Sequence, residues 1–263
     1  MAKKVYEESK IQAIADAIRE KTGGDTTYTT AEMPDGVGEV YEAGRDAEWN
    51  LMWDAIQRNG KKSDYGFVFM NYKSEWFYPK YDIVLGGGDS VAGELFGMSA
   101  FRGFNSGGSA DFDLSARFEE CGVTLDTSKC KILQYFMHTI NVKRVPTIDF
   151  SSCVNSYMAM YYTKIQIIDK LIFSETTVTN ANMFQYNNNL TTISAVEGVI
   201  AKNINFQHSP LDVPSINRII ACLKDYSSTG GTYTLTLKAD RQNMLSAAEK
   251  AVATNKGWTL VWS

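Results

Sequence analysis

Histidine, the side chain most suited to acid–base chemistry near pH 7, is scarce in this 263-residue chain. There are only two histidines, His138 and His208, and neither stands in a recognisable motif. Asn105 begins the sequence Asn-Ser-Gly-Gly, which resembles a serine nucleophile loop, but no histidine and aspartate partners can be assigned to it. These residues give no support for a nucleophilic enzyme.

Carboxylates and glycine-rich segments lead to the same expectation. Two carboxylate pairs occur, Asp111 with Asp113 and Glu119 with Glu120. A glycosidase needs two carboxyl groups across the scissile bond, but spacing alone does not distinguish such a pair from solvated surface, which we favour. Gly86-Gly-Gly-Asp-Ser lacks the Gly-Lys-Ser/Thr ending of a phosphate loop and predicts a flexible turn. We expect neither an enzyme nor a cofactor.

The cysteines and the overall charge narrow the classes of protein to which this chain could belong. Cys121, Cys130, Cys153 and Cys222 show no zinc-ligand spacing, so we expect no metal site and free, mostly buried thiols. The net charge of -4 argues against binding to nucleic acid or to an anionic membrane. The first ten residues lack the apolar core of a signal peptide, and no apolar run approaches the ~20 residues that span a bilayer. We expect synthesis in a cytoplasm and no membrane insertion.

Residues 1–60 have the pattern of two helices that attach or oligomerise the protein. Apolar residues recur at helical spacing before Gly23-Gly24 and at heptad spacing after Met33-Pro34. Such short helices are marginal alone, so they pack on the rest of the chain or join copies, as a trimeric coiled coil. The candidate oligomerisation residues are Ile11, Ile14, Ile18, Val37, Val40, Ala47 and Leu51.

Residues 61–110 are expected to form an irregular, aromatic-rich connector. Its aromatic cluster is Tyr72, Trp76, Phe77, Tyr78 and Tyr81. Aromatic side chains can stack on sugars, but we favour a cap that covers the open end of a repeat stack.

A 23-residue period over residues 111–209 is the strongest pattern in the sequence. Leu125, Ile148 and Leu171 are spaced by 23, as are Met137, Met160 and Met183, with a two-residue slip after Met183. Cys130 and Cys153 share the period and are expected in the interior. In a solenoid, apolar residues at such a period stack one coil on the next. The predicted repeat core is Leu125, Met137, Val142, Val145, Ile148, Phe150, Met160, Ile165, Ile168, Leu171, Phe173 and Met183.

Strand alternation around that core also suggests outward positions. The surface-binding candidates are Thr147, Asp149, Lys170 and Ile172, for which plain solvated surface is the competing interpretation. Residues 210–263 break the period. They predict a helix through Ile216–Leu223, a strand at Tyr233–Leu237, a helix over about 239–253 and a closing strand after Gly257. This β/α unit would cap the stack. The expected fold class is therefore α+β, with N-terminal helices, a short leucine-rich-repeat solenoid and a β/α cap.

Several stretches resemble a known family. IADAIREKTGG and AEMPDGVGEVYEAG are similar to N-terminal segments of tail proteins from phages and prophages of Gram-positive bacteria, and AEWNLMWDAIQRNGKKSDYGFVF looks like their next block. The LDTS and IDFS turns resemble BspA-like leucine-rich repeats. NINFQHSPLDVPSINRIIACLKDYS, TYTLTL and KGWTLVWS are similar to the ending that closes such repeats.

The resemblance implies a virion protein of a phage tail, in a tail fibre or baseplate. Its partners would be further copies, other tail or baseplate proteins, and a host-surface glycan or protein; no catalytic residues are carried over. Two alternatives stay open: a bacterial BspA-like surface adhesin or interaction module, and a cell-surface glycan depolymerase.

Overall fold

The computed structural model describes residues 69, 71–79, 82–86, 98–179, 182–230 and 232–263. The chain divides into two compact units, Met1–Ala55 and Ile56–Ser263. Every described residue belongs to the second unit. The seven candidate oligomerisation residues, from Ile11 to Leu51, and the two helices predicted around them lie outside the described residues.

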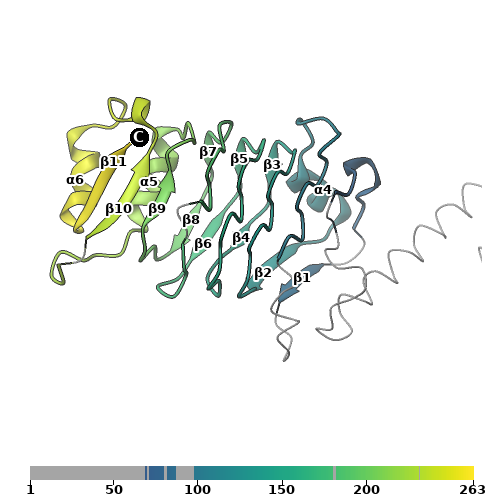
Figure 1. The fold of residues 1–263 in the computed structure, drawn as a ribbon, viewed down its shortest axis with the longest axis horizontal. Helices are drawn as coiled ribbons and strands as arrows, with labels where there is room; N and C mark the ends of the chain where they lie inside the picture. The colour runs from purple at the N-terminus through teal and green to yellow at the C-terminus, as the bar shows by residue number, and fades with distance from the viewer. Residues whose placement is uncertain (1–68, 70, 80–81, 87–97, 180–181, 231) are drawn as a thin grey trace, which may run out of the picture. The chain divides into compact units, whose positions relative to one another are not determined.

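The middle of the described part is a series of coils that pair through short parallel strands (Figure 1). One row contains β3 (Arg144–Val145), β5 (Ile167–Ile168) and β7 (Thr192–Ile193). The other contains β4 (Ile148–Asp149), β6 (Leu171–Phe173) and β8 (Val196–Gly198). Ile148 lies opposite Leu171, one full period on, and Leu171 lies opposite Val196, two positions beyond a full period. The pairing offset therefore changes at the point of the two-residue slip.

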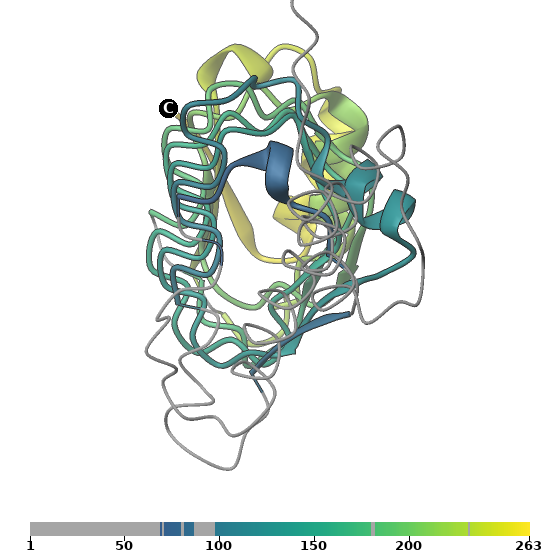
Figure 2. The same ribbon diagram turned by 90° about the vertical axis from the view of Figure 1, so that its right-hand side faces the viewer.

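The side of the coils away from these strands consists mainly of turns, and we call it the turn wall. It comprises residues 98–105, 133–140, 156–163, 182–190 and 203–209. Backbone hydrogen bonds join one turn to the next: Tyr135 N–H donates to Tyr157 O at 3.0 Å, and Thr139 N–H donates to Tyr161 O at 2.9 Å. Figure 2 looks along the stack. In this view the turns of successive coils overlie one another on the left, and the strands lie on the opposite side.

Positions on the turn wall, together with Asn71 before it, share an uncommon backbone conformation. Asn71, Gly103, Thr139, Tyr162 and Tyr186 all have a positive φ, between 55° and 66°. Each of the first four donates its N–H to the carbonyl oxygen of the residue that immediately precedes the next member. Thr139, for example, donates to Tyr161, the residue before Tyr162. The five residues thus form a left-handed column, one per coil, whose conformation is fixed by bonds between coils.

The interior between the two walls is apolar. All twelve residues of the predicted repeat core are buried, from Leu125 at 7% exposure to Met137, Met160 and Met183 at 0%. Burying such a side chain contributes about 1.5–3 kcal/mol, so each coil is stabilised mainly by the coils beside it. Cys130 and Cys153 are also fully buried. Leu190, Ile193 and Val196 continue the apolar pattern after the slip; the first two are fully buried, whereas Val196 is half-buried.

The N-terminal end of the stack is closed by aromatic packing. It contains η1 (Ser74–Trp76), β1 (Ile83–Gly86), α4 (Leu114–Cys121) and β2 (Leu125–Lys129), with β1 and β2 paired in parallel. Phe77 is fully buried and its ring lies 5.1 Å from Phe69 and 5.2 Å from Phe104. Arg117 of α4 donates to Phe77 O at 2.6 Å. Phe77 thus fills this end of the interior; Tyr81 lies outside the described residues.

The C-terminal end is a three-stranded parallel sheet with helices. The sheet order is β11 (Trp258–Trp262), β10 (Tyr233–Leu237) and β9 (Ile204–Phe206), with α5 (Val213–Ala221), η2 (Ala239–Arg241) and α6 (Ala247–Asn255). The prediction of one helix over about 239–253 is wrong in its start. Ser246 and Glu249 form a capping box, which fixes the first turn of α6 at Ala247 because both satisfy free backbone N–H groups there.

Candidate functional site

The four predicted surface-binding candidates lie along the strand rows and are half-buried. Asp149 accepts from Ser151 N–H at 2.7 Å, a local turn bond. Lys170 pairs with Glu197 at 2.7 Å. Ile172 and Asp149 lie opposite each other in the neighbouring strands β6 and β4, and Thr147 immediately precedes β4. The structure brings the four together in space but engages the two charged ones within the chain, so they present little free binding chemistry.

A different set of side chains gathers on the turn wall. Seven aromatic rings follow one another across the coils, and we call them the aromatic stripe. Its members are Tyr135, His138, Tyr157, Tyr161, Tyr162, Tyr186 and His208.

Ring contacts run through the stripe without a break. The Tyr135 ring lies 5.4 Å from His138, and His138 stacks on Tyr161 at 5.2 Å and 13°. Tyr161 meets Tyr186 edge-on at 5.3 Å, and Tyr186 lies 4.5 Å from His208. Such spacings are those of favourable aromatic pairs. The rings therefore hold one another in place and present a preformed surface.

The stripe is exposed enough to meet a ligand. Tyr162 and Tyr186 retain 54% and 38% of their accessible surface, and the other five rings are half-buried. Arg102 lies over the Tyr135 ring, 5.3 Å from its centre, at the N-terminal end of the stripe.

The backbone under the stripe carries strain at the tyrosines. Tyr135, Tyr162 and Tyr186 all have a positive φ, which costs a residue other than glycine about 1–2 kcal/mol. Tyr162 and Tyr186 belong to the left-handed column, in which an earlier coil uses Gly103, for which that conformation carries no such cost. Strained conformations persist where the structure over-determines them and are concentrated at functional sites. Ser99, Thr139 and Met158 on the same wall have this conformation too, so the hydrogen bonds between coils impose it and it does not single out the tyrosines.

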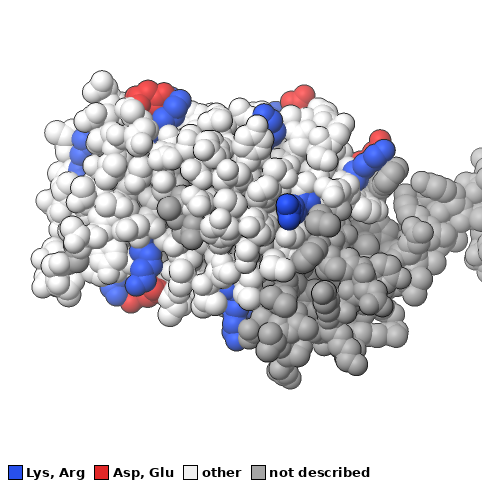
Figure 3. All heavy atoms as spheres, in the orientation of Figure 1, with Lys and Arg blue, Asp and Glu red and all other residues white. Residues whose placement is uncertain are grey.

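The turn wall is almost without charge. The segments 133–140, 156–163, 182–190 and 203–209 contain no Asp, Glu, Lys or Arg. Figure 3 shows one face of the protein on which charged side chains are sparse over the described residues. Burial lowers the pKa of His208, and burial together with nearby Arg102 lowers the pKa of His138, from an ordinary 6.5. Both imidazoles are therefore neutral at pH 7, and the stripe is an uncharged aromatic surface.

The other residues singled out for chemistry have structural roles. Asp113 caps α4 by accepting from Ala116 N–H at 2.8 Å, and Arg144 lies 3.7 Å from Asp113 and 3.6 Å from Glu119. Asn105 is buried and its amide donates to Asn141 O at 2.8 Å. Burial raises the pKa of Cys153. Asp113, Glu119 and Asn105 therefore take part in contacts within the chain.

Over the described ranges, no three His, Cys, Asp or Glu side chains are grouped to hold a metal ion. No helix within them has the length and apolar character to cross a membrane. Comparison with protein-family models, curated proteins and solved structures found no match.

The sequence contained a signal for the stripe that periodicity of apolar residues did not reveal. His138 and Tyr161 are one full period apart, while the steps from Tyr162 to Tyr186 and from Tyr186 to His208 each depart from the period by a single position. Reading only Leu, Ile, Met and Phe at this period identifies the interior. The same period applied to Tyr and His would have identified the outer surface.

Proposed function

We propose that this chain is a phage virion protein, a tail-fibre or baseplate subunit, that binds a host-surface glycan through its aromatic stripe. The coils are proposed to be a short BspA-like leucine-rich-repeat solenoid closed by a β/α cap. The virion assignment rests on the resemblance of the terminal blocks to tail proteins. The glycan assignment rests on the unbroken run of ring contacts from Tyr135 to His208.

The chemistry of the turn wall favours a saccharide. The C–H faces of a sugar ring pack on aromatic faces, while its hydroxyl groups need amide and hydroxyl partners at the edges. Gln134, Gln185, Asn205 and Gln207 supply half-buried amides on the same wall. A neutral, aromatic, amide-rich surface meets both demands at low desolvation cost, because it carries almost no charge to strip of water.

Binding without catalysis is the proposed activity. Each stripe would contribute a weak contact, and copies joined through residues 1–60 would present several stripes together. Linked sites can exceed single-site affinity by about 10²–10⁴. This arrangement suits attachment to a repetitive polymer on a cell surface.

The first test is saccharide binding by the full chain. A panel of bacterial surface polysaccharides and their oligosaccharides would be measured by biolayer interferometry and calorimetry. We expect binding that falls about 10-fold or more when Tyr161 and Tyr186 are both replaced by alanine, since a few central aromatic residues carry most interface energy. Tyr186→Phe keeps the ring and should retain most of the affinity.

Tyr78→Ala is the matched control, because Tyr78 is as exposed as Tyr186, at 37% against 38%, but lies outside the stripe. Its affinity should equal that of the wild type. If no saccharide binds, or if the Tyr161/Tyr186 double variant binds as tightly as Tyr78→Ala, the glycan proposal is wrong. Tyrosine-rich surfaces also suit protein partners, and binding to a deglycosylated surface protein alone would favour that second candidate.

A further inference from the structure

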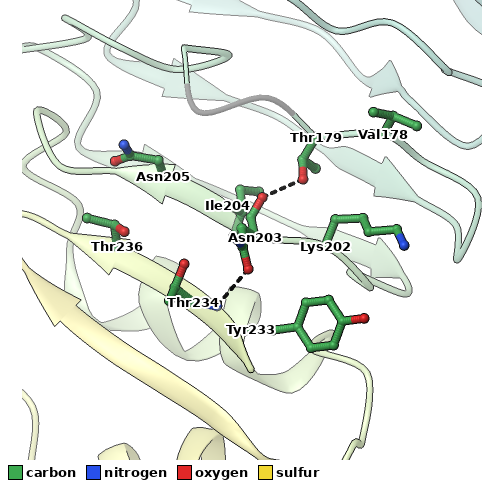
Figure 4. A pocket seen from close by; sticks show the side chains of 9 residues that line it. All are labelled: Val178, Thr179, Lys202, Asn203, Ile204, Asn205, Tyr233, Thr234 and Thr236. Carbon is green, nitrogen blue, oxygen red and sulfur yellow. Dashed lines mark hydrogen bonds between the residues drawn. The ribbon is translucent and has the colours of Figure 1, made fainter. Parts of the chain in front are cut away.

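A pocket of about 440 Å³ lies beside the last coil, on β9, β10 and the segment that contains Val178 and Thr179. Figure 4 shows its side chains: Lys202 and Tyr233 lie toward one end, Asn203 lies centrally, and Asn205 and Thr236 lie toward the other end. Asn205 is three residues before His208, the last ring of the stripe, on the same segment of the turn wall. The pocket therefore lies close to the C-terminal end of the stripe.

Hydrogen bonds engage the side-chain oxygens of two asparagines that line the pocket. Thr234 N–H donates to Asn203 Oδ1 at 2.9 Å, and Gln207 N–H donates to Asn205 Oδ1 at 2.9 Å. These backbone donors fix both amide oxygens, since only an oxygen can accept there. Each asparagine is left with an NH₂ group for which the described residues provide no hydrogen-bond partner.

The charge of the pocket has one sign. Among its lining residues Lys202 is charged and none is a carboxylate. Lys202 is exposed and forms no ion pair with the part of the chain that the structure describes. An ammonium and two free amide NH₂ groups form a donor set that matches a group rich in acceptor oxygens, above all a carboxylate or a phosphate.

We propose that this pocket binds an acidic sugar, one that carries a carboxylate or phosphate group. Lys202 and the Asn203 amide hold the anionic group, and Asn205, Thr234 and Thr236 meet the hydroxyl groups of the sugar. This inference rests on the proposed function in so far as the acidic sugar belongs to the glycan that stacks on the stripe. It gives that surface a chemical selectivity that the neutral rings lack.

The test compares two oligosaccharides that differ in one group, an oligosaccharide containing glucuronic acid and the same compound with that carboxylate reduced to an alcohol. Full-length wild type should bind the acidic compound more tightly. Lys202→Gln should weaken binding of the acidic compound about 10-fold and leave the reduced compound unchanged, because charge-assisted bonds are the strong ones. Lys143→Gln, at another exposed lysine, is the matched control and should change neither affinity.

Two monosaccharide probes separate the pocket from the stripe. Glucuronate and glucose 1-phosphate are titrated into wild type and Lys202→Gln, with ¹⁵N-labelled protein observed by NMR. Shifts of the Asn203 and Asn205 side-chain amides that Lys202→Gln abolishes support the pocket even if the stripe binds no glycan. If neither acid shifts these amides, or if Lys202→Gln weakens acidic and reduced oligosaccharides equally, the pocket proposal is wrong while the stripe proposal stands.

Discussion

Gly198 lies where two successive coils approach each other closely, so its substitution tests how tightly the coils are packed. This residue lies in β8 opposite Phe173 of β6, with φ of 79°. A Cβ placed on Gly198 would come 1.9 Å from the Phe173 carbonyl oxygen. Rotation of a side chain cannot relieve this overlap, because the obstructing atom belongs to the backbone of Phe173. Gly198→Ala must therefore move one coil away from the other.

The size of the effect follows from two contributions. The left-handed conformation costs an alanine about 1–2 kcal/mol. The overlap adds the cost of forcing extra volume into a packed contact, about 1–3 kcal/mol. Gly122→Ala separates the two: Gly122 has φ of 67°, but a Cβ added there would meet nothing within 4 Å, so only the first contribution applies. We expect Gly198→Ala to lose about 2–5 kcal/mol and Gly122→Ala about 1–2 kcal/mol.

Urea unfolding followed by far-ultraviolet circular dichroism measures both losses. The free energy of unfolding at zero denaturant and the slope are compared among wild type and the two variants. Equal losses for the two glycines would refute the reasoning, because they would mean that the β6–β8 contact yields without cost. A larger loss at Gly122 would do so more strongly.

Two further predictions concern the histidines and the N-terminal segment. Burial lowers the pKa of His138 and His208 below 6.5 in the folded state, so their favourable contribution to the free energy of unfolding is complete above pH 6.5 and is lost as the pH falls through the folded pKa. A double variant with His138→Gln and His208→Gln should therefore lose less stability than the wild type between pH 7 and pH 5 in thermal unfolding. An unchanged pH dependence would contradict this prediction. A chain without residues 1–60 should be monomeric by light scattering if those residues join the copies, and an unaltered assembly state would exclude that role.

The interior could be read from the sequence because apolar burial leaves a periodic trace. Leu125, Ile148 and Leu171 recur at one period, and in the structure all three are buried, with Ile148 directly opposite Leu171. The two-residue slip after Met183 was also visible in the sequence. In the structure, Leu171 accordingly lies opposite Val196, two positions beyond the regular spacing. The partial exposure of Val196 could not be predicted, because an apolar residue at the end of the pattern looks the same in the sequence whether or not a neighbouring segment covers it.

The candidate site was less predictable, for two physical reasons. Alternation of strands, which suggested Thr147, Asp149, Lys170 and Ile172, assigns faces only where the backbone is extended, and most of the turn wall is not extended. The donor-rich character of the pocket depends on which asparagine oxygens are already bonded, which spacing does not reveal. Likewise, the start of α6 depends on the local capping bonds of Ser246, not on the helical periodicity that extended the prediction back to residue 239.

The left-handed column makes the length of the outer surface adjustable in whole steps. Each coil adds one member of the column at the strand-to-strand spacing of about 4.8 Å. Extra residues are accommodated between successive members, since the step is 36 residues from Gly103 to Thr139, 23 from Thr139 to Tyr162 and 24 from Tyr162 to Tyr186. Duplication or loss of one coil by recombination would therefore lengthen or shorten the left-handed column by one member, and the outer surface with it, while both ends of the stack stay unaltered.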